Sequence, residues 1–465
     1  MKFFNTMTRA KEDFTPVHDG EVRLYTCGPT VYSRIHIGNF KTFLFEDILV
    51  RYFIYMGYKV KQVMNITDID DKTIRTSRQR NTPLKEVTDP YIELFHRDRK
   101  ALHIIDATNY PRATEHVPQM VEIVQKLMDN GHAYRAADNS IYYSISSFKD
   151  YGKLAHLEIN TLQSGASGRV ASDEYEKDSI SDFALWKAWD ENDGEVYWET
   201  QLGKGRPGWH IECSAMSMEY LGETLDIHTG GIDNIFPHHQ NEIAQSEGFT
   251  GKTFSKYWMH SYHLMVDGAK MSKSLGNFYT LEDLEKKGIS PETFRFFVVT
   301  NHYRTSLNYT DEAARAAGKA RDSLIEFVDR VRNIPDGPDK FDVGPTIEGM
   351  FREFEAGMDD DLNTPQAIAA VFDMTRPINR AIDEGKIGTL GRENLLKAIE
   401  KVNTVFAFLE GSETTIPEEV TELMKQREQA RKEKNWAMSD QLRDKILELG
   451  FIVKDTPQGQ RVTKK

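Results

Sequence analysis

Four residues of the chain form a candidate metal-binding set. Cys27 and Cys213 are its only cysteines, and His238 and Glu242 stand four residues apart just after a proline. A proline followed by this spacing predicts that His238 and Glu242 share one face of a helix. Thiolate, imidazole and carboxylate groups are ligands that zinc accepts. His239 and Glu242 are three residues apart and would also share a helix face, so the spacing alone does not choose between the two histidines. For each cysteine the alternative is a structural role, because a lone cysteine is more often a small buried apolar residue.

A second set of residues is suited to a nucleotide. The tetrapeptide HIGN, from His36 to Asn39, stands where a predicted strand passes through a loop into a predicted helix. A helix N-terminus offers free N–H donors and partial positive charge to a phosphate, and Gly38 lets a ligand approach the backbone. His36 and Asn39 add side-chain donors. On its own, such a tetrapeptide often only caps a helix.

The segment KMSKS, residues 270–274, carries Lys270 and Lys273 between glycines. A flexible cationic loop of this kind can close over a triphosphate and neutralise the charge that develops on a pyrophosphate leaving group. An isolated charge run is more often a solvated turn. The order and setting of the two segments therefore matter more than either one alone.

These residues need strands and helices to position them. Residues 22–27 predict a strand, residues 39–56 a helix closed by Gly57, and residues 58–66 a second strand. A strand–helix–strand unit with a long crossover is typical of a parallel sheet, and ligands bind beyond the carboxyl ends of such strands.

The middle of the chain interrupts this alternation. Residues 118–129 predict a helix, residues 140–148 read as a hairpin, and residues 160–178, rich in Gly, Ser and charge, predict a loop. The α/β pattern returns only near Trp209. We therefore expect an insertion in the middle of the α/β domain.

From about residue 310 the pattern is helical. Near residues 411–417 a polar linker precedes a small last unit with one helix opening at Pro417, another ending at Gly450, and a short strand, FIV. One apolar series has helical spacing and predicts a buried helix face: Leu395, Ile399, Val402, Phe406 and Leu409.

Composition narrows the class of protein. The 465 residues predict several domains, and two cysteines exclude a disulfide-rich secreted scaffold. The chain has no signal-like N-terminus and no run of roughly 20 apolar residues, so we expect a cytoplasmic protein without a membrane partner. The net charge is −13, yet residues 421–465 hold eleven Lys/Arg and seven Asp/Glu, a net +4. A chain with this net negative charge is not expected to bind polyanions over its whole surface. The net positive charge of residues 421–465 suits contact with a nucleic acid.

HIGN and KMSKS resemble the HIGH and KMSKS signatures of class I aminoacyl-tRNA synthetases. Nearly the whole chain resembles the cysteinyl-tRNA synthetase family within that class. Three departures are the final Asn of HIGN, Phe40-Lys41 in place of the usual Ala-Arg, and the ending QRVTKK where an aromatic and an arginine are usual. The matching stretches are YTCGPTVYSRIHIGN, NITDIDDK, DFALWK, GRPGWHIECSAM, DIHTGGIDNIFPHHQNEIAQ, KMSKSLGN, DDDLNTPQA and DTPQG.

The resemblance implies roles for individual residues. Its zinc ligands fall on Cys27, Cys213, His238 and Glu242, which decides the choice of histidine in favour of His238. Asp233 would contact either the ribose hydroxyls or the substrate ammonium. Each of these pocket residues also has a purely structural alternative, which is a turn or a helix cap for Asp233 and core packing for Trp209. Its catalytic and ATP-binding residues fall on His36, Gly38, Asn39, Lys270 and Lys273, its substrate pocket on Thr67, Trp209, His228 and Asp233, and its anticodon contacts on Arg431, Trp436, Asp440 and Asp455.

The implied fold is a Rossmann-like α/β catalytic domain with a parallel sheet and an inserted connective segment, then an α-helical bundle and a small C-terminal α+β anticodon-binding domain. The expected bounds are 1–115 with 201–265 for the catalytic domain, 116–200 for the insertion, 266–315 for the KMSKS and stem-contact region, 316–410 for the bundle and 411–465 for the anticodon-binding domain.

The implied activity is ligation of L-cysteine to tRNA(Cys), with ATP and Mg²⁺, by a monomer holding one Zn²⁺. A shape-only pocket separates cysteine from serine by roughly 10²-fold at best, whereas an open zinc position prefers a thiolate. We therefore expect zinc to select the amino acid and not to perform the adenylation. Two rivals are an enzyme that passes activated cysteine to an amine and a non-catalytic RNA-binding paralogue. The helical bundle and tail argue against the first, and the intact KMSKS and ligand set argue against the second.

Overall fold

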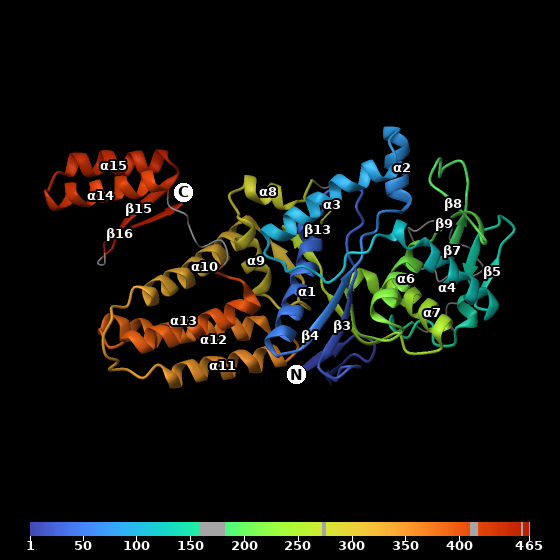
Figure 1. Ribbon diagram of the computed structural model, residues 1–465, viewed down its shortest axis with the longest axis horizontal. Helices are drawn as coiled ribbons and strands as arrows, with labels where there is room; N and C mark the ends of the chain where they lie inside the picture. Colours follow the sequence, from blue (N-terminus) through green and yellow to red (C-terminus); the bar gives the residue numbers. More distant parts are fainter. Residues whose placement is uncertain (158–181, 272–275, 410–416, 457–458, 465) are drawn as a thin grey trace. The chain divides into compact units, whose positions relative to one another are not determined.

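In the computed structural model, a four-stranded parallel sheet supports the candidate residues (Figure 1). The strand order is β11–β10–β3–β4, and every neighbouring pair is parallel. Helices connect these strands, as parallel pairing requires. The two predicted strands and the α/β class are confirmed. The strands are β3 (Glu21–Thr26), β4 (Lys59–Met64), β10 (Leu225–Gly231) and β11 (Ser255–Ser261).

The structure describes residues 1–157, 182–271, 276–409, 417–456 and 459–464. It divides into two units, Met1–Phe408 and Leu409–Lys465. The predicted loop at 160–178, residue Lys273 and nearly all of the predicted linker at 411–417 lie outside the described residues.

The predicted helix at 39–56 is α1 (Ile37–Tyr55). It begins two residues earlier than predicted because the His36 side chain caps it, accepting from the N–H groups of Gly38 and Asn39. The helix is buried almost all round, which is expected of a helix inside an α/β core. The other helices that cover the parallel sheet or stand beside it are α2 (Asp71–Arg80), α3 (Leu84–Ala101), α4 (Val117–Asp129), α6 (Trp209–Leu221) and α7 (Gln240–Thr250).

The inserted segment carries an antiparallel sheet of order β5–β6–β7–β9–β8. The predicted hairpin at 140–148 is wrong. Only Ile141–Tyr143 is a strand, paired with β5 and β7. Ile145–Ser147 forms a 3₁₀ turn, whose Ile145 N–H donates to the Asp182 carboxylate and not to a strand partner. The strands are β5 (Ala133–Arg135), β6 (Ile141–Tyr143), β7 (Phe183–Ala188), β8 (Trp198–Thr200) and β9 (Gly203–Pro207).

Short strands and helices follow the parallel sheet along the chain. The strand order β13–β12–β14 forms a small sheet, in which β13 ends on the first residue of KMSKS and β14 follows only after two further helices. Two N-terminal strands, β1 (Lys2–Asn5) and β2 (Ala10–Asp13), pair antiparallel. The remaining elements are β12 (Leu264–Val266), β13 (Ala269–Lys270), α8 (Leu281–Lys286), α9 (Pro291–Val299) and β14 (Leu307–Tyr309).

A helical region completes the larger unit (Figure 1). Leu395, Ile399, Val402 and Phe406 are all buried, which confirms the predicted apolar face. Its extension to Leu409 is wrong, because Ala407 has φ 50° and ends the helix in the left-handed region. The helices are α10 (Asp311–Arg332), α11 (Gly344–Asp359), α12 (Thr364–Asp383) and α13 (Thr389–Phe406).

The smaller unit consists of two helices and a hairpin. The predicted helices are α14 (Glu418–Lys432) and α15 (Trp436–Glu448). The predicted strand FIV is longer, β15 (Phe451–Thr456), and pairs with β16 (Gly459–Lys464), which the sequence patterns did not predict. The core of this unit is small and contains Val420, Ile446, Phe451, Val453 and Val462.

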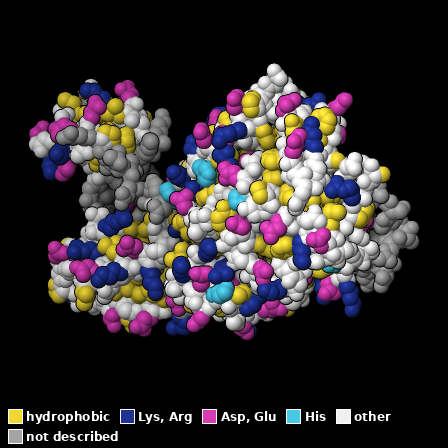
Figure 2. Space-filling model, turned by 45° about the vertical axis from the view of Figure 1, so that its right-hand side comes forward, with side chains coloured by type: hydrophobic (Ala, Val, Ile, Leu, Met, Phe, Trp, Pro, Cys, Tyr) yellow, Lys and Arg dark blue, Asp and Glu magenta, His cyan; other side chains and the backbone are white. Residues whose placement is uncertain are grey.

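Acidic and basic side chains are intermingled over the visible face of the structure (Figure 2). None of the helices within the described residues is both long and apolar enough to cross a bilayer.

Candidate functional site

The carboxyl ends of neighbouring parallel strands bring the candidate residues together. Cys27 directly follows β3, Thr67 follows β4, and Asp233 follows β10. Helix α6 begins at Trp209 and carries Cys213 one turn later. This edge of a parallel α/β sheet is where ligands are expected to bind.

The candidate metal ligands meet at this edge although more than two hundred residues separate the first, Cys27, from the last, Glu242. One ligand atom from each of Cys27, Cys213, His238 and Glu242 lies within 4.8 Å of the others. His238 Nε2 is 3.4 Å from Cys213 Sγ and 3.1 Å from Glu242 Oε1. His238 stands in a π-helical turn, Ile235–His239, that leads into α7, so the predicted shared face with Glu242 holds.

The chemistry of this cluster fits a zinc ion. Glu242 is fully buried, and its Oε1 accepts no well-aligned hydrogen bond from a described residue; the nitrogen at 3.1 Å from it belongs to His238, another candidate ligand. A buried carboxylate needs positive charge beside it, which a bound cation or a protonated His238 can supply. Two sulfur atoms, one imidazole and one carboxylate are also a donor set that zinc binds at tetrahedral sites.

A second set of residues meets the same distance criterion. It contains Cys27, His228, His239 and Glu242. Cys27 Sγ lies 3.2 Å from His239 Nε2, and His228 Nε2 lies 2.8 Å from Glu242 Oε2. Sequence spacing alone allowed either His238 or His239 to be a ligand together with Glu242. Both histidines also lie close enough to Glu242 to belong to a metal-binding set.

Burial controls the protonation of this cluster. Burial, followed by the charge of the neighbouring Cys213, raises the pKa of Glu242 well above its usual value. Burial also raises the pKa of Cys27. At Cys213, burial opposes ionisation, but hydrogen bonding with Cys27 and the charge of His238 outweigh it and hold the pKa well below the usual range. Burial therefore opposes ionisation of Glu242 and Cys27 while Cys213 ionises, and a bound cation would allow all three groups to be anionic together.

A pocket of about 390 Å³ joins this cluster to the nucleotide motifs. Trp209 lies in its wall and stacks on His238, with ring centroids 4.2 Å apart and an interplanar angle of 24°. An amino acid held beside the cluster and a nucleotide held at HIGN would therefore share one space. The candidate residues that line the pocket are Cys27, His36, Gly38, Asn39, Trp209, Asp233 and Lys270.

The HIGN segment both caps helix α1 and lines the pocket. His36 Nδ1 accepts the Gly38 N–H at 3.1 Å and the Asn39 N–H at 3.3 Å. A Cβ at Gly38 would lie 2.5 Å from Met271 Cε and 2.9 Å from His36 Nδ1, so a larger residue would displace the tip of Met271 and disturb the histidine cap.

The departure Phe40-Lys41 lies behind the pocket wall. Phe40 belongs to the apolar core. Lys41 Nζ donates to Ser261 Oγ and to the carbonyls of Tyr262 and Tyr303, and burial lowers its pKa to about 7. These two residues support the pocket from the side that faces away from a ligand.

Two predicted pocket residues occupy different settings. Asp233 is half-exposed, with Oδ1 3.8 Å from Lys270 Nζ and Oδ2 3.4 Å from His263 Nδ1. His228 is fully buried, does not line the pocket, and faces Glu242; burial lowers its pKa to about 4, which leaves a neutral imidazole. The structure therefore places His228 behind a candidate ligand. Lys273 lies outside the described residues.

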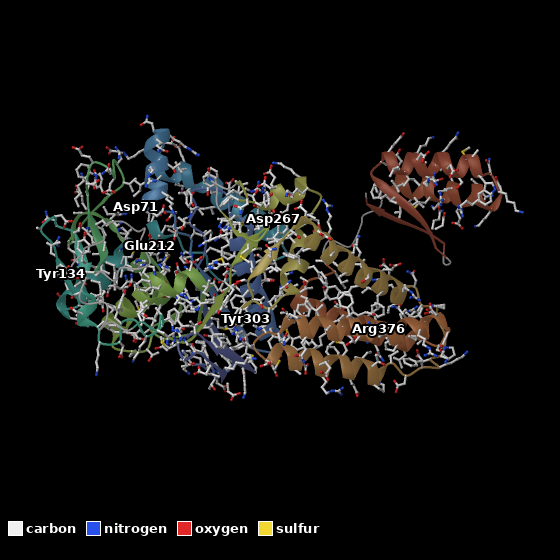
Figure 3. The ribbon with its side chains drawn as sticks, turned by 180° about the vertical axis from the view of Figure 1, so that it is seen from behind. Asp71, Tyr134, Glu212, Asp267, Tyr303 and Arg376 are labelled. Atoms are coloured by element: carbon white, nitrogen blue, oxygen red, sulfur yellow. The ribbon has the colours of Figure 1, made fainter. Side chains whose placement is uncertain are left out.

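Sequence reasoning missed Glu212. This residue, labelled in Figure 3, lies on α6 and is buried, and its Oε2 accepts from the Thr67 hydroxyl at 3.1 Å. The one signal for it was an acidic residue inside the otherwise apolar beginning of a helix, directly before Cys213.

The anticodon candidates lie in the smaller unit. Trp436 is 57% exposed, and the Arg431 guanidinium lies 5.6 Å from its ring centroid. Asp455 accepts from Arg427 at 2.8 Å and lies 3.1 Å from Arg431. Arg431, Trp436 and Asp455 therefore form one cluster. Asp440, four residues after Trp436 on α15, shares its helix face and pairs with Arg443.

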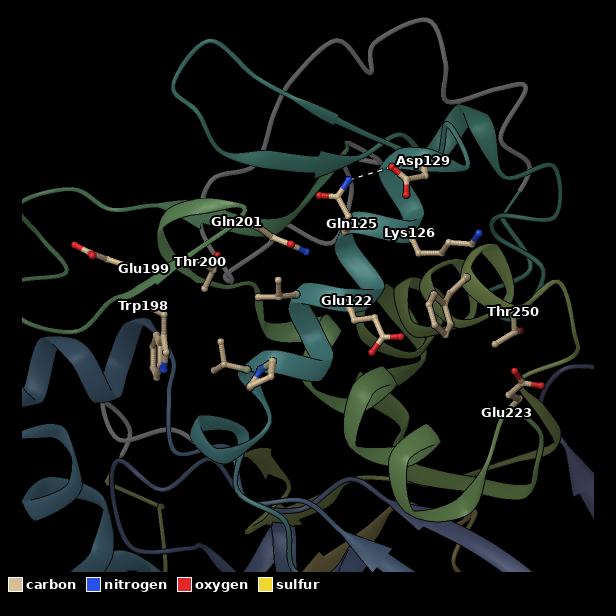
Figure 4. A pocket seen from close by; sticks show the side chains of 14 residues that line it. Glu122, Gln125, Lys126, Asp129, Trp198, Glu199, Thr200, Gln201, Glu223 and Thr250 are labelled. Atoms are coloured by element: carbon tan, nitrogen blue, oxygen red, sulfur yellow. Dashed lines mark hydrogen bonds between the residues drawn. The ribbon is translucent and has the colours of Figure 1, made fainter.

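A second groove, of about 860 Å³, lies along α4 and β8 (Figure 4). Apolar side chains of Val121, Trp198 and Phe249 line it, together with carboxylates such as Glu122 and Glu199. None of the residues predicted from sequence to act chemically lies in its wall, so the smaller pocket remains the candidate site.

Three family models match the chain in succession. The catalytic domain of class I (C) tRNA synthetases matches residues 13–319, the DALR domain residues 353–410, and the anticodon-binding domain of cysteinyl-tRNA ligase residues 413–462. The cysteine–tRNA ligase of Chlamydia muridarum is 48% identical over 473 residues, which cover 99% of each chain. That of Protochlamydia amoebophila is 46% identical, covering 100% of this chain and 98% of the relative.

Solved structures share the fold. A methionyl-tRNA synthetase of Mycobacterium tuberculosis in complex with methionyl-adenylate aligns with a TM-score of 0.60 and 14% identity, covering 84% of this chain and 91% of that one. A LeuRS–tRNA–LeuAMS ternary complex of Agrobacterium radiobacter aligns with a TM-score of 0.61 and 12% identity, covering 85% of each chain. At these identities the likeness is one of fold.

Proposed function

The chain belongs to the cysteinyl-tRNA synthetase family of class I aminoacyl-tRNA synthetases, and we propose that it ligates L-cysteine to tRNA(Cys) through a cysteinyl-adenylate, as a monomer. In the first step the cysteine carboxylate attacks the α-phosphate of ATP, and pyrophosphate leaves with Mg²⁺. In the second step a hydroxyl of the terminal tRNA ribose attacks the cysteinyl carbonyl, and AMP leaves.

One observation carries this proposal. The ligand atoms of Cys27, Cys213, His238 and Glu242 lie together beside the same pocket that HIGN and Lys270 line. A cysteine bound with its sulfur at the cluster has its carboxylate free to approach a nucleotide bound at HIGN. Adenylation then needs mainly positioning and charge stabilisation.

Among the two ligand sets, we take Cys27, Cys213, His238 and Glu242 to hold the zinc. This set uses both thiolates, the ligands that zinc favours, whereas the other set uses one. When bound, a zinc ion held by these four residues would take the thiolate of cysteine as a fifth ligand in preference to the hydroxyl of serine. His228 and His239 remain as neighbours that orient Glu242 and Cys27.

The remaining pocket residues take separate tasks. The positive end of the α1 dipole and the side chain of Asn39 attract phosphate, since the first N–H groups of the helix are already bonded within the chain. Lys270 and Lys273 stabilise the departing pyrophosphate. Trp209 covers the amino acid beside His238. Asp233, already close to Lys270, suits a role at the nucleotide end of the pocket, on the ribose hydroxyls.

Two measurements separate this function from its rivals. Cysteine-dependent exchange of pyrophosphate into ATP tests the first step, and transfer of labelled cysteine to tRNA(Cys) tests the second. We expect both. Exchange without transfer would favour a ligase that passes cysteine to an amine, and the absence of both would favour a non-catalytic RNA-binding protein.

We expect Trp436→Ala to lower kcat/KM for tRNA in aminoacylation by roughly ten- to hundredfold, because a base stacked on an aromatic ring contributes about 1–3 kcal/mol. Pyrophosphate exchange, which needs no tRNA, should stay within about twofold of the unmodified protein. The exposed Met438→Ala on the same helix is the matched control and should change neither activity. Equal loss of both activities in Trp436→Ala would contradict an anticodon role.

A further inference from the structure

Lys72 is a basic residue in the wall of the candidate pocket that belongs to neither HIGN nor KMSKS. It is the second residue of α2, the helix that follows the carboxyl end of β4. It lines the same pocket as HIGN and Lys270, and its Nζ lies 5.5 Å from the ring centroid of Tyr32, which also lines that pocket. Lys72 therefore brings positive charge to a bound ligand.

The first turn of α2 is held in place by the inserted sheet. Asp70 caps the helix. The carboxylate of Asp71, labelled in Figure 3, accepts from Lys187 Nζ on β7 at 3.3 Å and from the Arg206 guanidinium on β9. Lys187 and Arg206 are each 7% exposed, and losing one partner of such a buried ion pair is costly. Because successive residues of a helix point about 100° apart, holding Asp71 against the inserted sheet also fixes the direction of Lys72.

The other lysines and arginines of this wall already have an assignment. Among the described residues that line the pocket, these basic residues are Arg34, Lys72 and Lys270. Arg34 Nε and Nη2 each lie 3.0 Å from the Asp98 carboxylate, so its guanidinium is engaged by an acid of this chain. Lys270 is assigned to the departing pyrophosphate. Lys72 has no assigned ligand group, and the α-phosphate has no assigned side-chain cation.

The position of Lys72 matches that of the α-phosphate. The loop of residues 27–36 lines the pocket from Cys27, in the candidate metal cluster, to His36, at the helix cap. Tyr32, the residue beside Lys72 Nζ, lies about halfway along this loop. During adenylation the α-phosphate must lie between an amino acid whose sulfur is at Cys27 and a nucleotide whose phosphates are at HIGN.

We propose that Lys72 binds the α-phosphate of ATP and of the cysteinyl-adenylate through its ammonium, and that Asp71 is a positioning residue that holds it there. This inference rests on the proposed function, because it assumes that an adenylate forms in this pocket. A carboxylate oxygen of cysteine forms a bond to the α-phosphorus while the bond from that phosphorus to pyrophosphate breaks, and the electron pair leaves on pyrophosphate. No proton moves, so the α-phosphate stays anionic throughout and a cation beside it stabilises every stage.

The test compares three ligands on the zinc-loaded protein by titration calorimetry. Cysteinol adenylate carries the α-phosphate but no carboxylate, cysteine carries only the carboxylate, and adenosine carries neither. Lys72→Met nearly keeps the length of the side chain and removes its charge. We expect this variant to weaken cysteinol adenylate by roughly ten- to hundredfold and to leave cysteine and adenosine within about twofold. The kcat for pyrophosphate exchange should fall by about tenfold or more.

Three further variants isolate the contribution of the charge. Lys72→Arg keeps the charge and should keep the preference for cysteinol adenylate over adenosine. Arg75→Ala removes an exposed cation of the same helix that lies outside this pocket wall, and should change no affinity. Asp71→Asn should weaken cysteinol adenylate in the same direction as Lys72→Met and leave adenosine unchanged. Thermal unfolding of every variant separates loss of the fold from loss of the contact.

Other outcomes would contradict a role of Lys72 at the α-phosphate. Equal weakening of cysteinol adenylate and adenosine by Lys72→Met would give Lys72 a structural role only. Weakening of cysteine alone would place the ammonium on the carboxylate, and slower transfer to tRNA with unchanged exchange would place it on the nucleic acid. A folded Asp71→Asn protein with unchanged affinity for cysteinol adenylate would contradict the positioning role. Failure of the proposed function is a different result, the absence of cysteine-dependent pyrophosphate exchange in the unmodified protein.

Discussion

Replacing Cys213 by serine is expected to raise the KM for cysteine by about a hundredfold or more, while the KM for ATP changes by less than about threefold. Serine offers a neutral hydroxyl where zinc needs a soft thiolate, so the site loses metal or holds it poorly. The pocket would then have only its shape to separate cysteine from serine, and shape alone discriminates such near-isosteres weakly. Nucleotide contacts at HIGN and Lys270 are left in place.

Pyrophosphate exchange at varied cysteine and varied ATP measures both constants, with zinc content determined on the same samples. Ala215→Ser is the matched control, because it adds a hydroxyl to the same buried helix and removes no ligand. A Cys213→Ser protein that keeps the cysteine KM of the unmodified enzyme would contradict the assignment of Cys213. A parallel rise in both KM values would indicate a distorted pocket.

Lys270→Ala is expected to lower kcat for pyrophosphate exchange by roughly 10²- to 10³-fold, with cysteine affinity within about threefold. Removing one group that stabilises charge in a transition state commonly has an effect of that size. Lys270 is exposed at the pocket, where its nearest anion in this structure is Asp233 at 3.8 Å. A weak exposed pair of this kind lets the ammonium exchange its partner for a phosphate.

Single-turnover formation of the adenylate, together with equilibrium binding of cysteine, measures this prediction. Lys286→Ala serves as the control, because that lysine pairs with Glu282 on the surface of α8 and lies outside the pocket wall. Weaker cysteine binding without slower adenylate formation would move Lys270 from the reacting phosphates to the amino acid.

The parallel sheet and its first crossover could be predicted because their signals are local. The apolar runs that became β3 and β4, and the capped helix between them, each lie within a few consecutive residues. The buried face of α13 was predictable for the same reason, up to the left-handed Ala407. The β15–β16 hairpin was not, because its second strand is polar and has no alternating pattern.

The candidate site was only partly predictable. Spacing placed His238 and Glu242 on one helix face, but nothing local connects them to Cys27, which the fold brings beside them. The resemblance to a family supplied that connection. It supplied none for Glu212, because a buried acidic residue looks in sequence like any other helical glutamate until the Thr67 hydroxyl is seen to point at it.

Pyrophosphate exchange by one preparation of the unmodified protein, assayed with zinc bound, after removal of zinc by a chelator, and after zinc is returned, tests the central claim most directly. We predict that removal raises the cysteine KM by about a hundredfold or more, that the ATP KM stays nearly constant, and that added zinc restores the original value. A cysteine KM that is unchanged in the zinc-free protein would contradict the claim that zinc selects the substrate thiol.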